Sequence, residues 1–278
     1  MVPNPASEFL DIPECGPHPV QALRRFGRFL RALGKPVSRG PVALADALPW
    51  LVPKVRPLFD YESFTMRTGQ AVPEFRLLAG AFAVSLVVDL PNQDLDVGPA
   101  LLRVWNVDFD RLMQTARSNL LARCGEKGFQ DLGRGRFRST WRDNLDGSRM
   151  LLPGLLKRLP LEGDPVVMVP NRNTLLVVGS EDLQGLRWVL EGASRDLNED
   201  LAALNGSPLR LRNFQWETFQ AGEDHPIGPL LGRIEQRRIT HDGARRKAMQ
   251  DERRGRRGGA AVVAPYLLDS LPAADPFR

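Results

Sequence analysis

The stretch Gly163–Ser180 restricts the fold more than any other part of the chain. It contains two short apolar runs, Val166–Val169 and Leu175–Val178, which are rich in β-branched residues. Five turn-forming residues, Pro170–Thr174, separate the two runs. Short β-branched runs bounded by turn residues are typical of strands, and a short connection joins antiparallel neighbours. The stretch therefore predicts a β-hairpin.

Both apolar runs are continuous, without the alternation of a strand that has one face in water. A strand that is apolar on both faces is covered on both faces, so the hairpin is expected at the centre of a sheet with helices or another layer outside it. Asp182 follows the hairpin as a candidate N-cap for a helix. Leu183, Leu186 and Val189 continue from it at helical spacing.

The remaining elements alternate between strands and helices. Strands are predicted over 52–58 at a sheet edge, over 75–78, 82–90 and 136–141, and over 209–219 with a bulge near Asn213. Helices are predicted over 42–48, after the candidate N-cap Asp108, and along the leucine stripe from Leu151 to Leu159. This order predicts an α+β fold, with a predominantly antiparallel sheet and helices packed on its faces.

Composition divides the chain into three regions. Residues 1–40 read as an irregular arm followed by an amphipathic helix over 19–33, and residues 41–220 carry the predicted α+β domain. Residues 221–278 form a basic C-terminal appendage with few core residues. The net charge of +5 is concentrated there, because 233–257 contains ten Arg and Lys but four Asp and Glu.

Four segments, in order, resemble the YtpQ-like proteins, a bacterial family of unknown function. They are Val52–Arg56, Val87–Leu90, Asn144–Arg149 and the hairpin around Pro170–Asn173. The resemblance covers about residues 45–220 and implies the family's domain, but it implies no reaction. Two positions depart from the family pattern, since Asn173 stands where an Asp is usual and Gly179 where an Ala is usual.

Polar residues at the predicted hairpin turn and before the leucine stripe form the first candidate site. They are Asp146, Ser148, Arg149, Asn171, Arg172 and Asn173. Arginine offers a planar donor fork to carboxylate or phosphate, and Asn and Ser add neutral hydrogen bonds. If the two segments converge, they would suit an anionic ligand or a peptide terminus. In the structural alternative, Asp146 caps the turn or helix and the two arginines pair with it.

The basic run near the C-terminus forms the second candidate site. Its members are Arg245, Arg246, Lys247, Arg253, Arg254, Arg256 and Arg257. Basic side chains contact phosphates without regard to base sequence, while the lack of aromatic residues among them gives no indication of base stacking. The alternative is a solvated tail that binds nothing.

The sequence contains no recognised catalytic, metal-binding or cofactor-binding spacing. Its two cysteines, Cys15 and Cys124, provide no disulfide framework, which fits the cytoplasm, and no apolar run is long enough to span a membrane. We therefore expect a non-enzymatic binding or protein-interaction module that contacts a protein partner or a second copy of itself. Two alternatives are a sequence-independent nucleic-acid-associated protein and an enzyme that acts on an anionic small molecule.

Overall fold

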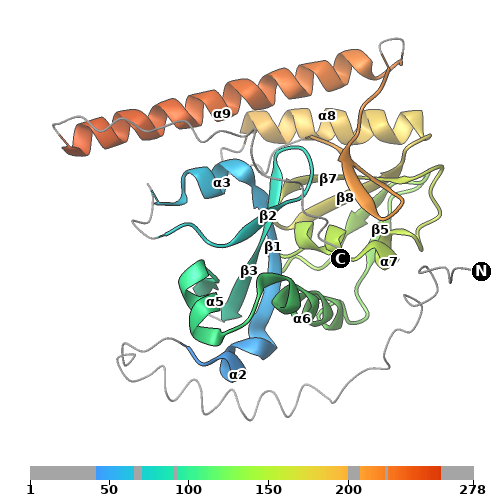
Figure 1. Cartoon of the computed structure of the whole chain (residues 1–278). Helices are drawn as coiled ribbons and strands as arrows, with labels where there is room; N and C mark the ends of the chain where they lie inside the picture. Colours follow the sequence, from blue (N-terminus) through green and yellow to red (C-terminus); the bar gives the residue numbers. More distant parts are fainter. Residues whose placement is uncertain (1–41, 66–70, 91–92, 200–206, 223–224, 258–278) are drawn as a thin grey trace, which may run out of the picture. The chain divides into compact units, whose positions relative to one another are not determined.

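The computed structural model describes residues 42–65, 71–90, 93–199, 207–222 and 225–257 (Figure 1). The chain divides into two compact units, Met1–Pro49 and Trp50–Arg278. The described part of the first unit contains α2 (Leu44–Ala47), which confirms the helix predicted over 42–48, and the start of the 3-10 helix η2 (Leu48–Trp50). The predicted arm and helix within residues 1–40 lie outside the described residues, and the three-part division of the chain stays a prediction.

The first sheet of the second unit is built around β3 (Phe82–Leu90). On one side β3 pairs with β1 (Leu51–Pro57), and on the other with both β2 (Phe75–Leu77) and β4 (Gln93–Asp96). All these pairings are antiparallel. β1 is an edge strand, as predicted. An edge strand can contain Pro53 and Pro57, because proline has no N–H to donate and an edge strand has a neighbour on one side only.

The second sheet contains the predicted hairpin at its centre. Its strand order is β10-β9-β7-β8-β6-β5, where β7 (Pro165–Asn171) and β8 (Thr174–Gly179) are the two halves of the hairpin. β5 (Phe129–Asp131) and β6 (Phe137–Ser139) extend the sheet beyond β8. The α+β class and the antiparallel pairing are thus confirmed, and the strands form two sheets.

The prediction of a single bulged strand over 209–219 is wrong. The segment is a second hairpin, with β9 (Leu209–Arg212) paired to β10 (Gln215–Thr218). Asn213 and Phe214 form its two-residue turn with φ angles of 50° and 64°. Positive φ at both central residues defines the turn whose twist matches that of two antiparallel strands. Asn tolerates this conformation, and the Phe214 ring lies under the Lys157 ammonium group, with Nζ 3.3 Å from the ring centroid.

The predicted leucine-stripe helix is interrupted. In its place are the 3-10 helix η3 (Gly147–Leu151) and the short helix α7 (Pro153–Leu156). Leu152 separates them with φ −113° and ψ 73°. The ring of Pro153 disfavours the helical conformation in the residue before it, so a helix can begin at Pro153 but cannot run through Leu152.

The two helices for which the sequence predicted an N-cap both have one in the structure. Asp108 accepts a hydrogen bond from the backbone of Arg111 at 2.7 Å at the start of α6 (Phe109–Ala122). Asp182 accepts one from the backbone of Gly185 at 2.8 Å at the start of α8 (Leu183–Glu199). Helices α3 (Leu58–Glu62) and α5 (Pro99–Trp105) complete the first half of the unit.

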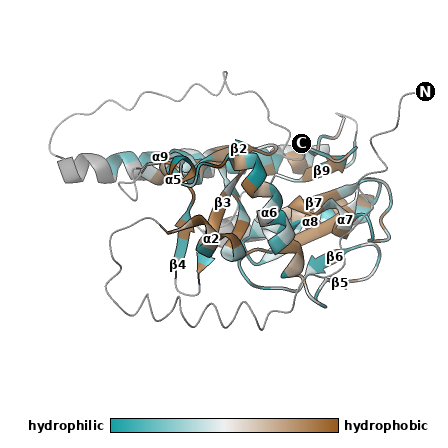
Figure 2. Cartoon of the chain, turned by 60° about the horizontal axis from the view of Figure 1, so that its bottom comes forward, coloured by the Kyte–Doolittle hydropathy of each residue, from teal (hydrophilic) through white to brown (hydrophobic). Residues whose placement is uncertain are grey.

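A long helix, α9 (Gly228–Arg257), follows the second sheet and lies beside α8 (Figure 1). Helix α8 packs on β7 and β8, and buried residues of these strands, of α8 and of the start of α9 form one core. Figure 2 shows hydrophobic residues concentrated on strands such as β3 and β7. η3 contacts β1 of one sheet and both β7 and β8 of the other, so it links the two sheets.

Candidate functional site

Three of the predicted ligand residues lie in the interior. Asp146 and Arg149 are 0% exposed and Ser148 is 2% exposed, although all three precede or belong to the short helix η3. A buried charge is stable only when it is paired and hydrogen-bonded. The contacts of these residues therefore decide whether they serve binding or folding.

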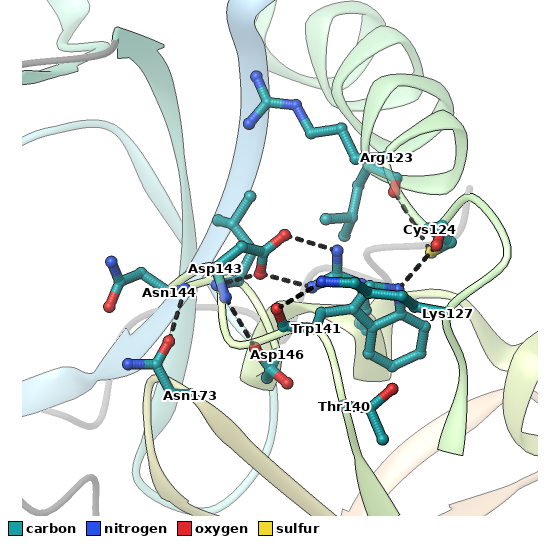
Figure 3. A network of polar contacts seen from close by, with 12 residues as sticks. Arg123, Cys124, Lys127, Thr140, Trp141, Asp143, Asn144, Asp146 and Asn173 are labelled. Atoms are coloured by element: carbon teal, nitrogen blue, oxygen red, sulfur yellow. Dashed lines mark hydrogen bonds and ion pairs between the residues drawn. The ribbon is translucent and has the colours of Figure 1, made fainter. Parts of the chain in front are cut away.

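The guanidinium group of Arg149 pairs with Asp143 through two of its three nitrogens. Its Nη1 and Nη2 donate to the two carboxylate oxygens of Asp143 at 2.8 and 2.7 Å, and it lies 4.2 Å from the centroid of the Trp141 ring (Figure 3). Burial alone would raise the pKa of Asp143, but the hydrogen bonds and charge of Arg149 outweigh burial and hold that pKa below its ordinary value. Arg149 is fully buried while Asp143 is partly open to solvent, so the pair joins the interior to the surface and serves the fold.

The Cys124 thiol belongs to the same cluster. Burial raises its pKa, and the nearby Arg149 only partly opposes that effect. The thiol donates to the carbonyl of Leu120 at 3.4 Å, while the indole of Trp141 donates to the carbonyl of Cys124 at 2.9 Å. A thiol whose pKa is raised is a poor nucleophile. The surroundings of Cys124 therefore favour packing over catalysis.

Asp146 and Ser148 also hold the fold together. Asp146 makes no side-chain cap to η3 but accepts a hydrogen bond from the backbone of Asp143 at 3.3 Å. The structural alternative, in which both arginines pair with Asp146, is wrong about the partners, because Arg149 pairs with Asp143 and Arg172 lies near Asp60. The hydroxyl of Ser148 accepts the backbone N–H of Val55 at 3.0 Å and joins η3 to β1.

The hairpin turn is fastened to the loop before η3. Asn173 Oδ1 accepts a hydrogen bond from the backbone of Asn144 at 2.7 Å (Figure 3). Asn171 Oδ1 accepts one from the backbone of Asn173 at 2.9 Å. The two segments do converge, as the sequence analysis anticipated. The side-chain oxygen of Asn173 accepts this bond as the carboxylate of an Asp would, without the negative charge.

The third turn residue, Arg172, points elsewhere. It is 52% exposed and its Nη2 lies 3.9 Å from Asp60 Oδ2 in α3. The same carboxylate receives Arg245 of α9, with 3.4 Å between Nη2 and Oδ1. Arg172 and Arg245 were predicted to belong to separate sites, one for a ligand and one for nucleic acid. They meet at Asp60.

The contacts around Asp60 form what we call the α3–α9 junction, made of Phe59, Asp60, Glu62, Arg245 and Arg246. Arg246 donates to Glu62 Oε2 through Nη2 at 2.7 Å and Nε at 3.3 Å. The guanidinium carbons of Arg245 and Arg246 lie 4.3 and 5.8 Å from the centroid of the Phe59 ring. Two members of the basic run are therefore held against the protein, whereas Lys247 is exposed. Arg253, Arg254, Arg256 and Arg257 lie in the last turns of α9.

Beside this junction is a cavity of about 670 Å³. α3, the turn between β2 and β3, the β9–β10 hairpin and α9 all contribute to its wall. Its apolar wall includes Leu58, Phe59, Phe219, Leu231 and Ile234. None of the six predicted ligand residues lines it, whereas Arg246 of the basic run does.

The charged groups of the cavity are paired with one another. Arg238 donates to Glu235 at 2.8 and 2.5 Å and to Asp242 at 3.3 Å, and Arg246 pairs with Glu62. The hydrogen bonds from Arg238 hold the pKa of Glu235 below its ordinary value and outweigh its partial burial. The cavity is thus lined by apolar residues and by charged residues that are joined in ion pairs.

A second set of charges was not anticipated from the sequence. Lys54 and Arg56 of β1 are buried and pair with Asp94 and Asp96 of β4, with 2.7 Å between Arg56 Nη1 and Asp96 Oδ1. The two basic residues are two positions apart in β1, and the two acidic residues are two positions apart in β4. This spacing places the charged residues of each strand on one face of that strand. The alternation of charged residues within β1 and β4 is the sequence signal that could have indicated these ion pairs.

In the part of the chain that the structure describes, no group of three or more His, Cys, Asp or Glu is arranged to hold a metal ion. No helix within these same ranges combines the length and apolar character that crossing a bilayer requires. No protein-family model, curated protein or solved structure matches the chain. The resemblance to the YtpQ-like family stays an expectation.

Proposed function

We propose that this chain is a non-enzymatic binding module whose cavity beside α9 takes an apolar segment of a partner protein. One observation carries the proposal: the cavity has an apolar wall, and its charged groups are already joined in ion pairs. Protein interfaces combine buried apolar side chains with polar groups that are hydrogen-bonded. Its volume of about 670 Å³ is enough for a few side chains of a partner.

The same pairing argues against an anionic small molecule as the ligand. Arg238 and Arg246 are the arginines of the cavity wall, and each is engaged with carboxylates. The enzyme alternative relied on Asp146, Arg149 and Arg172, of which the first two are buried and none lines the cavity. We therefore do not pursue the enzyme alternative. We keep kinship with the YtpQ-like family and a cytoplasmic location as proposals, the latter supported by a chain with only two cysteines.

The test places a photo-crosslinking amino acid at Gln220, which is exposed and lines the cavity. After irradiation in cells, a captured protein is identified and purified. Its affinity is then measured by calorimetry for the wild-type chain and for Leu231→Arg, which puts a charge on the apolar wall. We expect Leu231→Arg to weaken binding about tenfold or more, which corresponds to roughly 1.4 kcal/mol.

The control is Leu132→Arg, since Leu132 is also exposed and does not line the cavity. Crosslinking from position 132 should not capture the same protein, and Leu132→Arg should bind it with unchanged affinity. An equal loss of affinity in both variants, or none in Leu231→Arg, would refute the cavity as the binding site. Sedimentation of the purified chain shows whether the captured partner is a second copy of the chain.

A second candidate function is sequence-independent binding of nucleic acid by α9. The observation in its favour is that α9 continues without a break to Arg257, so all seven basic residues predicted for this role lie on one helix. We expect a labelled single strand and a labelled duplex to bind the full chain, measured by fluorescence anisotropy. Affinity should fall steeply between about 50 and 200 mM salt, because bound phosphates release counterions.

The matching variant replaces the last four basic residues of α9 with glutamine: Arg253, Arg254, Arg256 and Arg257. Its salt slope should fall by roughly three to four, one for each lost phosphate contact. The control changes four exposed arginines elsewhere: Arg103, Arg111, Arg138 and Arg158. If both variants lose affinity equally, total charge and not α9 explains the binding. No binding at low salt removes this candidate.

A further inference from the structure

The α3–α9 junction pairs part of the basic run with acidic residues of the same chain. Arg245 and Arg246 occupy consecutive positions in α9 and contact Asp60 and Glu62 of α3. The Phe59 ring lies against both guanidinium groups. An arginine fork accepts carboxylate and phosphate in the same geometry. The two acids therefore occupy the positions that two phosphates would take.

The contacts that close the junction are long or open to solvent. The distances from Asp60 oxygens to Arg245 and Arg172 are 3.4 and 3.9 Å. Arg246 is 51% exposed and Arg172 is 52% exposed. Exposed pairs such as Arg246–Glu62 contribute little to stability and are screened by salt, and the partly buried pair of Arg245 with Asp60, whose side chain is 12% exposed, is long. A ligand with a high density of negative charge can therefore compete for these arginines.

The charge around the junction stays positive after this pairing. Arg172, Arg245 and Arg246 face Asp60 and Glu62, and the exposed Lys247 follows directly in α9. From 245 to 257 the helix rises about 18 Å. One strand of a duplex carries roughly five phosphates over that length. The junction thus lies at the start of the part of α9 whose sequence holds the seven basic residues, and this part is long enough for a phosphate backbone.

We propose that Arg172, Arg245, Arg246 and Lys247 bind the phosphate backbone of a nucleic acid, and that Asp60 and Glu62 compete with it for the arginines. This inference rests on the second candidate function. It assigns a binding site to that function and identifies the two acids as groups of the same chain that compete with the nucleic acid. Binding of nucleic acid opens the junction, and loss of the two acids strengthens binding. Because a ligand must displace Asp60 and Glu62, ligands with a high density of negative charge bind in preference to ligands with a low density.

The experiment compares the full-length wild-type chain with Asp60→Asn/Glu62→Gln. The probe is a fluorescein-labelled dT strand, titrated by anisotropy at about 50 and 200 mM salt. We expect the variant to bind roughly three- to tenfold more tightly at the lower salt, with a salt slope steeper by about one to two. Adding Arg245→Gln/Arg246→Gln to this variant should return the affinity to that of the wild type or below.

The control is Asp110→Asn/Glu126→Gln, which removes the same number of negative charges from two exposed positions outside the junction, one in the first turn of α6 and one in the turn that follows this helix. It should bind as the wild type does, apart from a small effect of net charge. Circular dichroism confirms that each variant is folded. Amide hydrogen exchange gives a second readout, since exchange around 245–251 should increase in the junction variant and in the wild type with dT strand.

Equal affinities for the junction variant and the control would overturn the inference. If the wild type binds and the Arg253–Arg257 variant loses binding while the junction variant is unchanged, the inference fails and the second candidate function stands. If none of the chains binds, both fail. Binding of poly-glutamate as tight as that of the dT strand would overturn the assignment to a phosphate backbone and indicate an acidic protein partner.

Discussion

Replacing Arg149 with Met is expected to lower the free energy of unfolding by about 2–3 kcal/mol. The guanidinium is fully buried, donates twice to Asp143 and lies over Trp141. Methionine fills part of the volume but leaves the carboxylate of Asp143 and its neighbours without the buried cation. Asp143 is exposed and its carboxylate can be hydrated, so the cost comes from the two lost charged hydrogen bonds and the lost packing on Trp141. Urea unfolding followed by tryptophan fluorescence measures the loss.

Two companion variants separate charge from geometry. Arg149→Lys keeps the charge but cannot form the bidentate fork or the flat stack on Trp141, so it should still lose much of this stability. Arg172→Met removes an arginine that is 52% exposed, and should change stability by less than about 1 kcal/mol. A loss for Arg149→Met no larger than that for Arg172→Met would contradict the structural role of the pair.

Gly179→Ala is expected to destabilise the protein by about 1–3 kcal/mol or more, as overpacked interiors do. A Cβ at position 179 would lie 2.6 Å from the backbone nitrogen of Glu162 and 2.8 Å from its carbonyl carbon. The obstacle is backbone and not a flexible side chain, so the clash is relieved only by moving the strand or the loop before β7. Thermal unfolding of the variant measures the cost.

The control is Gly154→Ala in α7, where an added Cβ would meet nothing within 4 Å. A helical glycine replaced by alanine gains about 0.5–1 kcal/mol, so this variant should be as stable as the wild type or slightly more stable. The comparison bears on the family resemblance, because an Ala is usual at position 179. If Gly179→Ala does not change the stability, the close approach of Glu162 does not require a glycine at position 179.

Local signals predicted much of the fold. The central hairpin, the caps at Asp108 and Asp182 and the edge position of the proline-containing strand all depend on neighbours in sequence. The break at Leu152 was also a local signal, since Pro153 follows it, but the leucine spacing was given more weight. The two-residue turn at Asn213 and Phe214 was not predicted, because phenylalanine rarely adopts the positive φ that this turn requires.

The candidate site could be predicted only in part, because its partners are remote in sequence. The sequence identified Asp146, Ser148 and Arg149 as notable, and nothing in their spacing showed that they would be buried. Nothing in the sequence joined Arg245 to Asp60, which precedes it by 185 residues. Pairing over such separations is decided by how α9 lies across the second unit, and that depends on the core it shares with α8.

The bond between Ser148 and Val55 has a consequence for the order in which the chain can fold. Its two members are 93 residues apart, and η3, which carries Ser148, contacts strands of both sheets. A chain emerging from the ribosome cannot satisfy the amide of Val55 in this way until η3 has been synthesised. Contacts of such long range slow folding, because the loop between them must close first. The two sheets of the second unit should therefore gain their final structure together, in one late cooperative step.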